Sequence, residues 1–342
     1  MRKLLMLTVV LFAAVKIIAQ DDPVSVLNKI NVQMEAVSKR YVVYQSVVAH
    51  SDNLRKAEKR RQEMMNQVTT ARQSLAEIPY YKGDRMLHQA FGEYLKLVEY
   101  NLNEDYAKMV NMKEIAEQSY DKMEAYMLLK DKVSEKMRLA GEKLDSVQRT
   151  YCKKYDIKLV DEQKSELSRQ LEKISEVSKY EDKLYLIFFK CNVIEGDLLE
   201  SLDKKNVNAT EQLRSSLKSF AEEGSAILDT LKGYRGDNTL VTACRRSMEY
   251  YKKAADRYAD FTGFFTKEAN FNRLKQQFEG DKDMRKDKAA LDKYNNAVKE
   301  MNDGIGQYNN TNDYLNKYRS ETINFWNNAI KQFLDRHIPV AD

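Results

Sequence analysis

Apolar residues in this chain recur at alternating steps of four and three positions, and this spacing constrains the fold more than any other feature. One such stripe contains Ile30, Met34, Val37, Tyr41, Tyr44 and Val48. Steps of four and three place side chains on one face of an α-helix, whereas strands alternate at every second residue. Only 11 Gly and 3 Pro are present in 342 residues, so few positions can interrupt the helices. The sequence predicts an all-α protein. Its low glycine content argues against a nucleotide-binding α/β enzyme, which needs a glycine-rich loop.

Two related motifs mark predicted turns. Pro79 cannot continue a helix, and it is followed by Tyr-Lys-Gly-Asp at residues 81–84. A similar Tyr-Arg-Gly-Asp motif occurs 153 positions later, at residues 234–237. We expect the glycine of each motif to adopt backbone angles that other residues resist, and its aspartate to cap the following helix.

The repeated motif predicts an internal duplication. Lys113-Glu114 recurs as Lys267-Glu268 at nearly the same separation. Long helices joined by short turns pack antiparallel. We therefore expect two tandem antiparallel four-helix bundle units, residues 20–158 and 159–342. The second contains about 28 additional residues, with a break expected at Glu279–Asp281. One prolonged coiled coil is the alternative, and the proline and Gly-Asp breaks count against it.

The N-terminus predicts an export signal. A basic start precedes the apolar run Leu4–Val15, which has the size of a signal-peptide core, and we place cleavage after Ala19. Residues 1–19 would then be removed. An uncleaved anchor helix is the alternative, but the run is shorter than the ~20 residues that span a bilayer. No second run of that length follows. We expect an exported protein, periplasmic or at the cell surface or secreted, with no transmembrane segment after cleavage.

The charge distribution does not indicate a nucleic-acid partner. Loss of Arg2, Lys3 and Lys16 with the leader lowers the formal charge from +5 to +2. Nucleic-acid binding needs a concentrated basic face. The densest basic cluster, Arg55–Arg61, contains Glu58 and spreads around a helix. We interpret it as a solvated face, with binding to an anionic surface or lipid as the alternative.

Motifs for catalysis or metal binding are missing. None of His50, His88 and His337 has a Glu three residues before it, as a di-iron bundle requires, and the zinc pattern His-Glu-x-x-His does not occur. Asp84 and His88 lie one helical turn apart and could share a metal, but we expect Asp84 to serve as a helix cap instead. The chain also has no nucleophile elbow, phosphate-binding Gly loop or Cys-x-x-Cys pair. We therefore predict a non-enzymatic protein without catalytic residues, metal or cofactor, and no cofactor-binding residue can be assigned.

The three cysteines allow two interpretations. Cys191 lies on an apolar stripe and Cys244 lies near one, which favours small buried hydrophobic residues. An exported chain can instead form disulfides. If any pair is bridged, we expect it to be Cys152–Cys191.

The chain resembles a family of helical exported surface proteins of Bacteroidetes and spirochaetes. The residues that carry the resemblance are Gln20 after the cleavage site, Tyr81–Asp84, Glu93-Tyr94 and Asn103–Tyr106. That family has no assigned activity, so the resemblance implies a helical envelope protein and no particular site residues.

Two functions follow as expectations. The first is a binding or interaction module of the cell envelope whose partner is a protein or another envelope component. The alternative is a small-ligand or metal-binding periplasmic bundle, with a pocket where aromatic side chains leave space, such as Tyr94, Tyr258 and Trp326. Polar residues that interrupt the stripes would pair within the core, mark a pocket or indicate an incorrect register; these are Arg61, Asn312 and Arg319.

Overall fold

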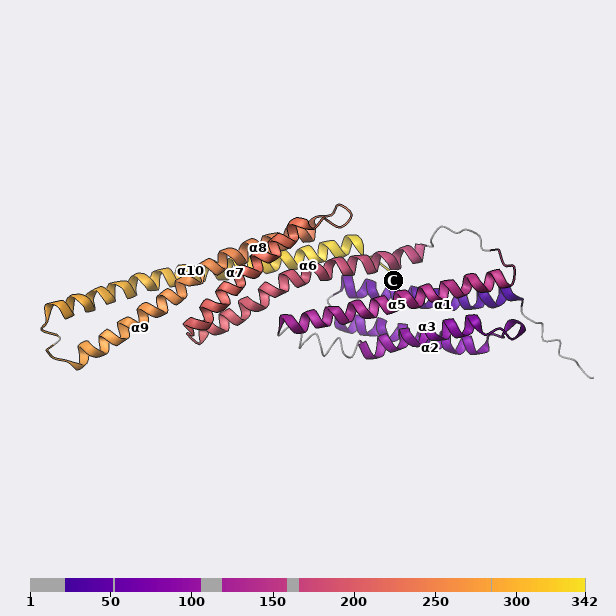
Figure 1. The fold of residues 1–342 in the computed structure, drawn as a ribbon, viewed down its shortest axis with the longest axis horizontal. Helices are drawn as coiled ribbons and strands as arrows, with labels where there is room; N and C mark the ends of the chain where they lie inside the picture. Colours follow the sequence, from indigo (N-terminus) through magenta and orange to yellow (C-terminus); the bar gives the residue numbers. More distant parts are fainter. Residues whose placement is uncertain (1–21, 52, 106–118, 159–165, 284, 342) are drawn as a thin grey trace, which may run out of the picture.

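A computed structural model describes residues 22–51, 53–105, 119–158, 166–283 and 285–341. All the elements in these ranges are helices and none is a β-strand, so the predicted all-α fold is confirmed. The predicted leader, residues 1–19, lies outside the described residues. Figure 1 shows an elongated molecule in which the two halves of the chain follow one another along the long axis.

The helices of the N-terminal half share one core. They are α1 (Pro23–His50), α2 (Leu54–Glu77), the 3-10 turn η1 (Tyr81–Gly83), α3 (Met86–Tyr100), the π-helical turn η2 (Asn101–Asp105) and α5 (Tyr120–Lys154). The largest fully buried side chains of this core include Ile30, Leu87, Phe91, Leu95, Leu144 and Tyr151. They lie on the stripes of period 3.6 that the sequence contains, so hydrophobic burial accounts for the packing.

The helices of the C-terminal half form a second core. They are α6 (Glu166–Asp203), α7 (Val207–Thr230), α8 (Thr239–Arg257), α9 (Ala259–Gly280) and α10 (Lys288–His337). Close packing of α7 depends on Gly224, since a Cβ there would lie 2.7 Å from Met248 Sδ and 2.9 Å from Ile187 Cγ2. Phe188 and Trp326 stack at 4.7 Å in the centre of this core.

Helix ends agree with the sequence at two places and differ at a third. α2 ends at Glu77, just before Pro79, and α9 ends at Gly280, within the predicted break. The described C-terminal half contains five helices where four were expected, because Tyr258 separates α8 from α9. No proline or glycine marks that position, so the spacing of apolar residues alone could not locate it.

α9 and the first part of α10 form a two-helix arm. In Figure 1 this hairpin extends beyond the other helices, at the end of the molecule opposite to α2 and α3. Phe264 of α9 lies against Gly304 of α10, where an added Cβ would be 3.1 Å from the ring. Nearer the tip, Phe278 stacks on Tyr294 at 4.6 Å. The arm is therefore an antiparallel pair of helices with an aromatic seam.

The two halves contact each other through α1 and through α5 and α6. Val42 of α1 belongs to the C-terminal core, whereas Val48, which the stripe placed in the interior, is 48% exposed. The predicted stripe is therefore wrong at the end of α1, because this part of the helix faces the other half. His50 Nδ1 lies 2.9 Å from Asp335 of α10, and the predicted boundary at residue 158 falls between α5 and α6.

Candidate functional site

The first Gly-Asp turn sets the start of α3. Gly83 has a φ of 76°, as expected, but the preceding Lys82 also adopts left-handed angles, with a φ of 49°. Such angles are uncommon outside glycine. Asp84 Oδ1 accepts the backbone N–H of Met86 at 2.8 Å. The aspartate lies one residue before the N-cap position but satisfies the first helical N–H, so the predicted capping role is confirmed.

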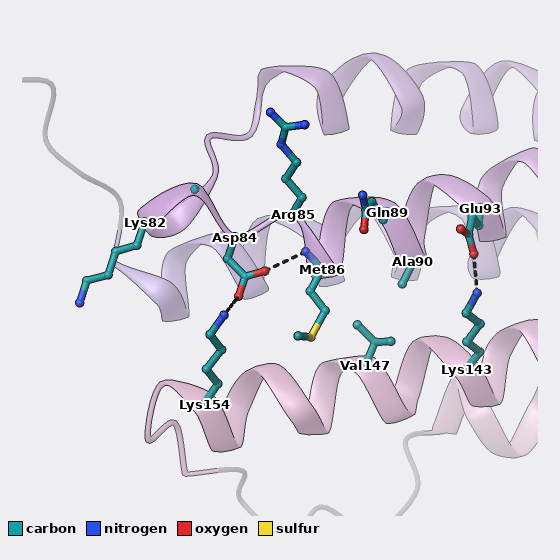
Figure 2. Close-up of a pocket in the computed structure, with 11 residues that line it drawn as sticks. Lys82, Asp84, Arg85, Met86, Gln89, Ala90, Glu93, Lys143, Val147 and Lys154 are labelled. Atoms are coloured by element: carbon teal, nitrogen blue, oxygen red, sulfur yellow. Dashed lines mark hydrogen bonds and ion pairs between the residues drawn. The ribbon is translucent and has the colours of Figure 1, made fainter.

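A pocket of about 610 Å³ lies beside this turn, between α3 and α5 (Figure 2). Its two carboxylates are both paired: Asp84 with Lys154 at 2.7 Å and Glu93 with Lys143 at 2.6 Å. Figure 2 shows the Lys82 side chain directed away from the space between these helices. The Tyr155 hydroxyl also donates to Asp84 at 2.9 Å. These pairs connect α3 to α5, which is a structural arrangement rather than a set of groups free for chemistry.

Hydrogen bonding controls the charge of Asp84. Burial alone would raise the pKa of this carboxyl, but donors from Lys154, from the Met86 backbone and from Tyr155 lower the pKa below its usual value. The carboxylate is therefore held ionised at the turn.

The second Gly-Asp turn has the same geometry. Gly236 has a φ of 90°, and Asp237 Oδ1 accepts the backbone N–H of Thr239 at 2.8 Å. Asp237 Oδ2 accepts Arg336 at 3.1 Å and His337 at 2.9 Å, both at the end of α10. Burial alone would raise the pKa of Asp237, but these donors hold it well below its usual value. Both turns connect the start of one helix to the end of the last helix in the same half.

A buried charged cluster lies at the base of the arm. Glu195 of α6 is 2% exposed, and its Oε1 accepts the hydroxyls of Tyr250 at 2.6 Å and Tyr258 at 2.8 Å. Arg319 of α10 places Nε 3.2 Å from the same oxygen and donates to the Tyr258 hydroxyl at 2.7 Å. The cluster thus joins α6, α8 and α10 where α8 gives way to α9, and burial raises the pKa of both tyrosines.

The polar residues that interrupt the stripes have three different environments. Arg319 pairs with Glu195 within the core, which is one of the three outcomes that we expected for these residues. Arg61 bonds Glu58 at 2.9 Å and donates to the Leu102 carbonyl at 3.1 Å, which joins α2 to the turn η2 that follows α3. Asn312 is exposed, and the neighbouring Thr311 is buried instead, so the predicted register was wrong at that point.

The aromatic residues expected to leave space instead fill the core. Tyr258 and Trp326 are 0% and 1% exposed, and Tyr94 packs against the N-terminal core. Another surface pocket, of about 900 Å³, lies between α1 and α2 and includes Val24 and Val32.

The predicted cysteine pair is not brought together. Cys152 is buried in the N-terminal core and Cys191 in the C-terminal core, and all three thiols are free. Cys244 lies in the same core as Cys191, and its Sγ contacts the Leu184 carbonyl at 3.6 Å. The expectation of small buried hydrophobic residues is confirmed.

In the described parts of the chain, no group of three or more histidine, cysteine or carboxylate side chains could hold a metal ion. His88 is buried, and its Nε2 donates to the Ile78 carbonyl at 2.9 Å. His88 therefore holds the end of α2, and it is not arranged with Asp84 as a metal site.

One register of α10, with steps of seven residues, is buried near the end of the helix but is half-buried or exposed in the arm. The register contains Leu291, Val298, Ile305, Asn312, Arg319, Trp326 and Phe333. Trp326 and Phe333 are 1% and 0% exposed, since other helices pack over them. In the arm, Leu291 and Ile305 are 40% and 42% exposed. We call Leu291, Val298 and Ile305 the arm stripe.

Comparison with family models, with curated proteins and with solved structures finds no match. Within the described ranges, no helix combines the length and apolar character needed to cross a membrane.

Proposed function

We propose that this chain is an exported, non-enzymatic helical protein that binds a protein or another component of the cell envelope through its arm. The observation that carries the proposal is the arm stripe. A seven-residue spacing of apolar side chains is the pattern by which one helix packs on another. In the body of the protein, other helices cover this register. In the arm no helix of the described chain covers Leu291 or Ile305, so these two side chains are accessible to a partner helix.

The envelope location rests on the predicted leader and on the resemblance to helical surface proteins. N-terminal sequencing of the protein from cells that produce it naturally tests the leader. A mature chain that begins at Gln20 supports export, whereas one that retains Met1 contradicts it.

A photo-crosslinking experiment tests the arm as the binding surface. A photoreactive phenylalanine analogue replaces Ile305 in the producing cells. The matched control carries the same analogue at Glu300, an exposed residue about 140° away around the same helix. We expect a discrete crosslinked product from position 305 and none from position 300. Equal products from both positions, or none from either, would contradict the proposal.

We also propose that the two halves arose by duplication. α2 and α7 each contain 24 residues and each begin after an asparagine cap, Asn53 or Asn206, so that the caps are 153 positions apart. The two Gly-Asp turns have the same separation. In both turns a basic residue precedes the glycine with left-handed angles, Lys82 with a φ of 49° and Arg235 with a φ of 50°.

A further correspondence supports the duplication. Arg61 donates to the Leu102 carbonyl at 3.1 Å, and Arg214 donates to the Ala255 carbonyl at 3.4 Å. Each arginine also bonds the glutamate three residues before it. Donor and acceptor positions are both displaced by 153. If the duplication is real, the two arginines have the same structural role, and replacing them should have similar effects on stability.

A further inference from the structure

The surface where α8 packs beside α10 carries a row of basic side chains next to a row of aromatic ones. The guanidinium carbon of Arg246 lies 4.4 Å from the ring centre of Phe325. That of Arg257 lies 4.2 Å from the ring centre of Tyr314. We call this surface the α8–α10 seam; its residues are Arg246, Lys253 and Arg257 of α8 and Tyr314, Tyr318 and Phe325 of α10.

Each row occupies one strip of its helix. The three bases are separated by steps of seven and four positions, and the three aromatic residues by steps of four and seven. Such steps keep each row within about 40° around its helix axis. The two helices are antiparallel, so the same register places Lys253 opposite Tyr318. Each row extends for about 16 Å, which matches about three turns of a second helix.

The seam is open to a partner. Tyr318 and Phe325 are each 38% exposed, and the three bases are exposed as well. In the described chain no carboxylate forms an ion pair with these bases. An arginine that stacks on a ring keeps the N–H groups at the edge of its guanidinium free, and these can bind a carboxylate through two hydrogen bonds. The seam therefore offers oriented donors beside accessible apolar rings.

The corresponding contact of the N-terminal half is an ion pair. The salt bridges at the two Gly-Asp turns align α3 with α8 at a displacement of 153 positions and α5 with α10 at 182. Arg246 and Phe325 then correspond to Glu93 and Lys143, which pair at 2.6 Å. This comparison rests on the proposed duplication, whereas the contacts of the seam do not. The N-terminal half compensates the charge between its helices, and the described C-terminal half provides no acid for its arginine.

We propose that the α8–α10 seam is a second interaction surface, which shares no residue with the arm stripe and binds an acidic helical segment of another protein. Carboxylates of that segment bind the three bases, and its apolar side chains pack on the exposed rings. Two acids on the same helices border the seam, Glu249 on α8 and Glu321 on α10. A partner of uniform negative charge, such as a nucleic acid or an anionic lipid surface, would be repelled by both. A protein segment can place bases opposite these acids, and this favours a protein as the partner.

Photo-crosslinking with sequencing of the crosslinked segment tests the assignment. The photoreactive phenylalanine analogue replaces Tyr318 in the full chain, in the cells that produce it, and mass spectrometry identifies the peptide joined to position 318. We expect a discrete product with one other protein. The joined segment should carry Asp or Glu at steps of three, four or seven residues, as the rows of the seam require.

A pair of double variants tests whether the bases of the seam hold that segment. Arg246→Gln combined with Arg257→Gln removes two charges from the seam. The matched control, Arg245→Gln combined with Lys252→Gln, removes the same charge from the strip of α8 where Arg245 pairs with Asp229 of α7. We expect the first double variant to lower the yield of the product at least about fivefold, as the loss of two exposed charge pairs predicts. The control should change the yield less than about twofold, and circular dichroism at 222 nm verifies that each purified variant is helical.

Four results would overturn the proposal. They are a joined segment without clustered acids, a product that contains only copies of this chain, the absence of any protein product, and an equal loss of yield in both double variants. Crosslinking from position 305 reports on the arm stripe separately, so failure at the seam is distinguished from failure of the arm.

Discussion

Replacement of Arg319 by leucine should destabilise the protein more than removal of a surface ion pair does. The variant leaves the Glu195 carboxylate, which is 2% exposed, without its cation. Removing one member of a buried pair typically costs about 3–5 kcal/mol, whereas an exposed pair contributes about 0–1 kcal/mol. Tyr250 and Tyr258 still donate to Glu195 in the variant. We therefore expect the lower end of the buried range, about 3 kcal/mol at pH 8.

Urea unfolding of the wild type and of Arg319→Leu, followed by circular dichroism at 222 nm, measures the loss, with the slope m checked for a change in cooperativity.

A double variant provides the matched control. Arg319→Leu combined with Glu195→Gln contains no buried charge, so it should be more stable than Arg319→Leu alone at pH 8. A loss below about 1 kcal/mol for Arg319→Leu would refute the reasoning. The pair would then behave as a solvated one, despite its position at the base of the arm.

Three further predictions concern the turns and the repeated arginines. Asp84→Ala removes a backbone cap and two side-chain bonds, so urea unfolding should show a loss of about 1–3 kcal/mol; no loss would contradict the capping role. The lowered pKa of Asp237 means that its contribution, present above the ordinary value of 3.8, is lost as pH falls below it. Acid titrations should therefore show Asp237→Asn to be less stable at pH 7 but less sensitive to acid than the wild type; parallel curves would contradict this. Arg61→Leu and Arg214→Leu should each cost about 1.5–3 kcal/mol in thermal or urea unfolding, and costs that differ by more than about 2 kcal/mol would weigh against the duplication.

Sequence periodicity was sufficient to predict that the chain is helical, because the cores obey a single rule, which is burial of one face of each helix. It did not locate the division of α8 from α9 at Tyr258. It failed where one helix serves two neighbours. α1 turns Val42 toward the other half, and this left Val48 exposed although it lies on the predicted stripe. Such an exchange depends on the arrangement of the halves, and spacing along a single helix carries no information about it.

The buried cluster at the base of the arm was only partly accessible to sequence reasoning. Arg319 was recognised as an interruption of its stripe, but its partner was missed. Both Ile194 and Glu195 continue the steps after Cys191, and hydrophobicity favours the isoleucine. The structure buries Glu195 because two tyrosines and an arginine converge on it. The signal available in the sequence was that Glu195, a charged residue, lies four positions after Cys191 and so on the same apolar face of the helix.

Native mass spectrometry of the mature protein, purified from cells that produce it naturally, tests most directly whether this chain binds a macromolecule rather than a small ligand. The account predicts the mass of residues 20–342, alone or with a macromolecular partner, and loss of that partner when Ile305 is replaced by lysine. A small additional mass on the single chain, released on denaturation, would contradict the account and identify a bound metal or small molecule.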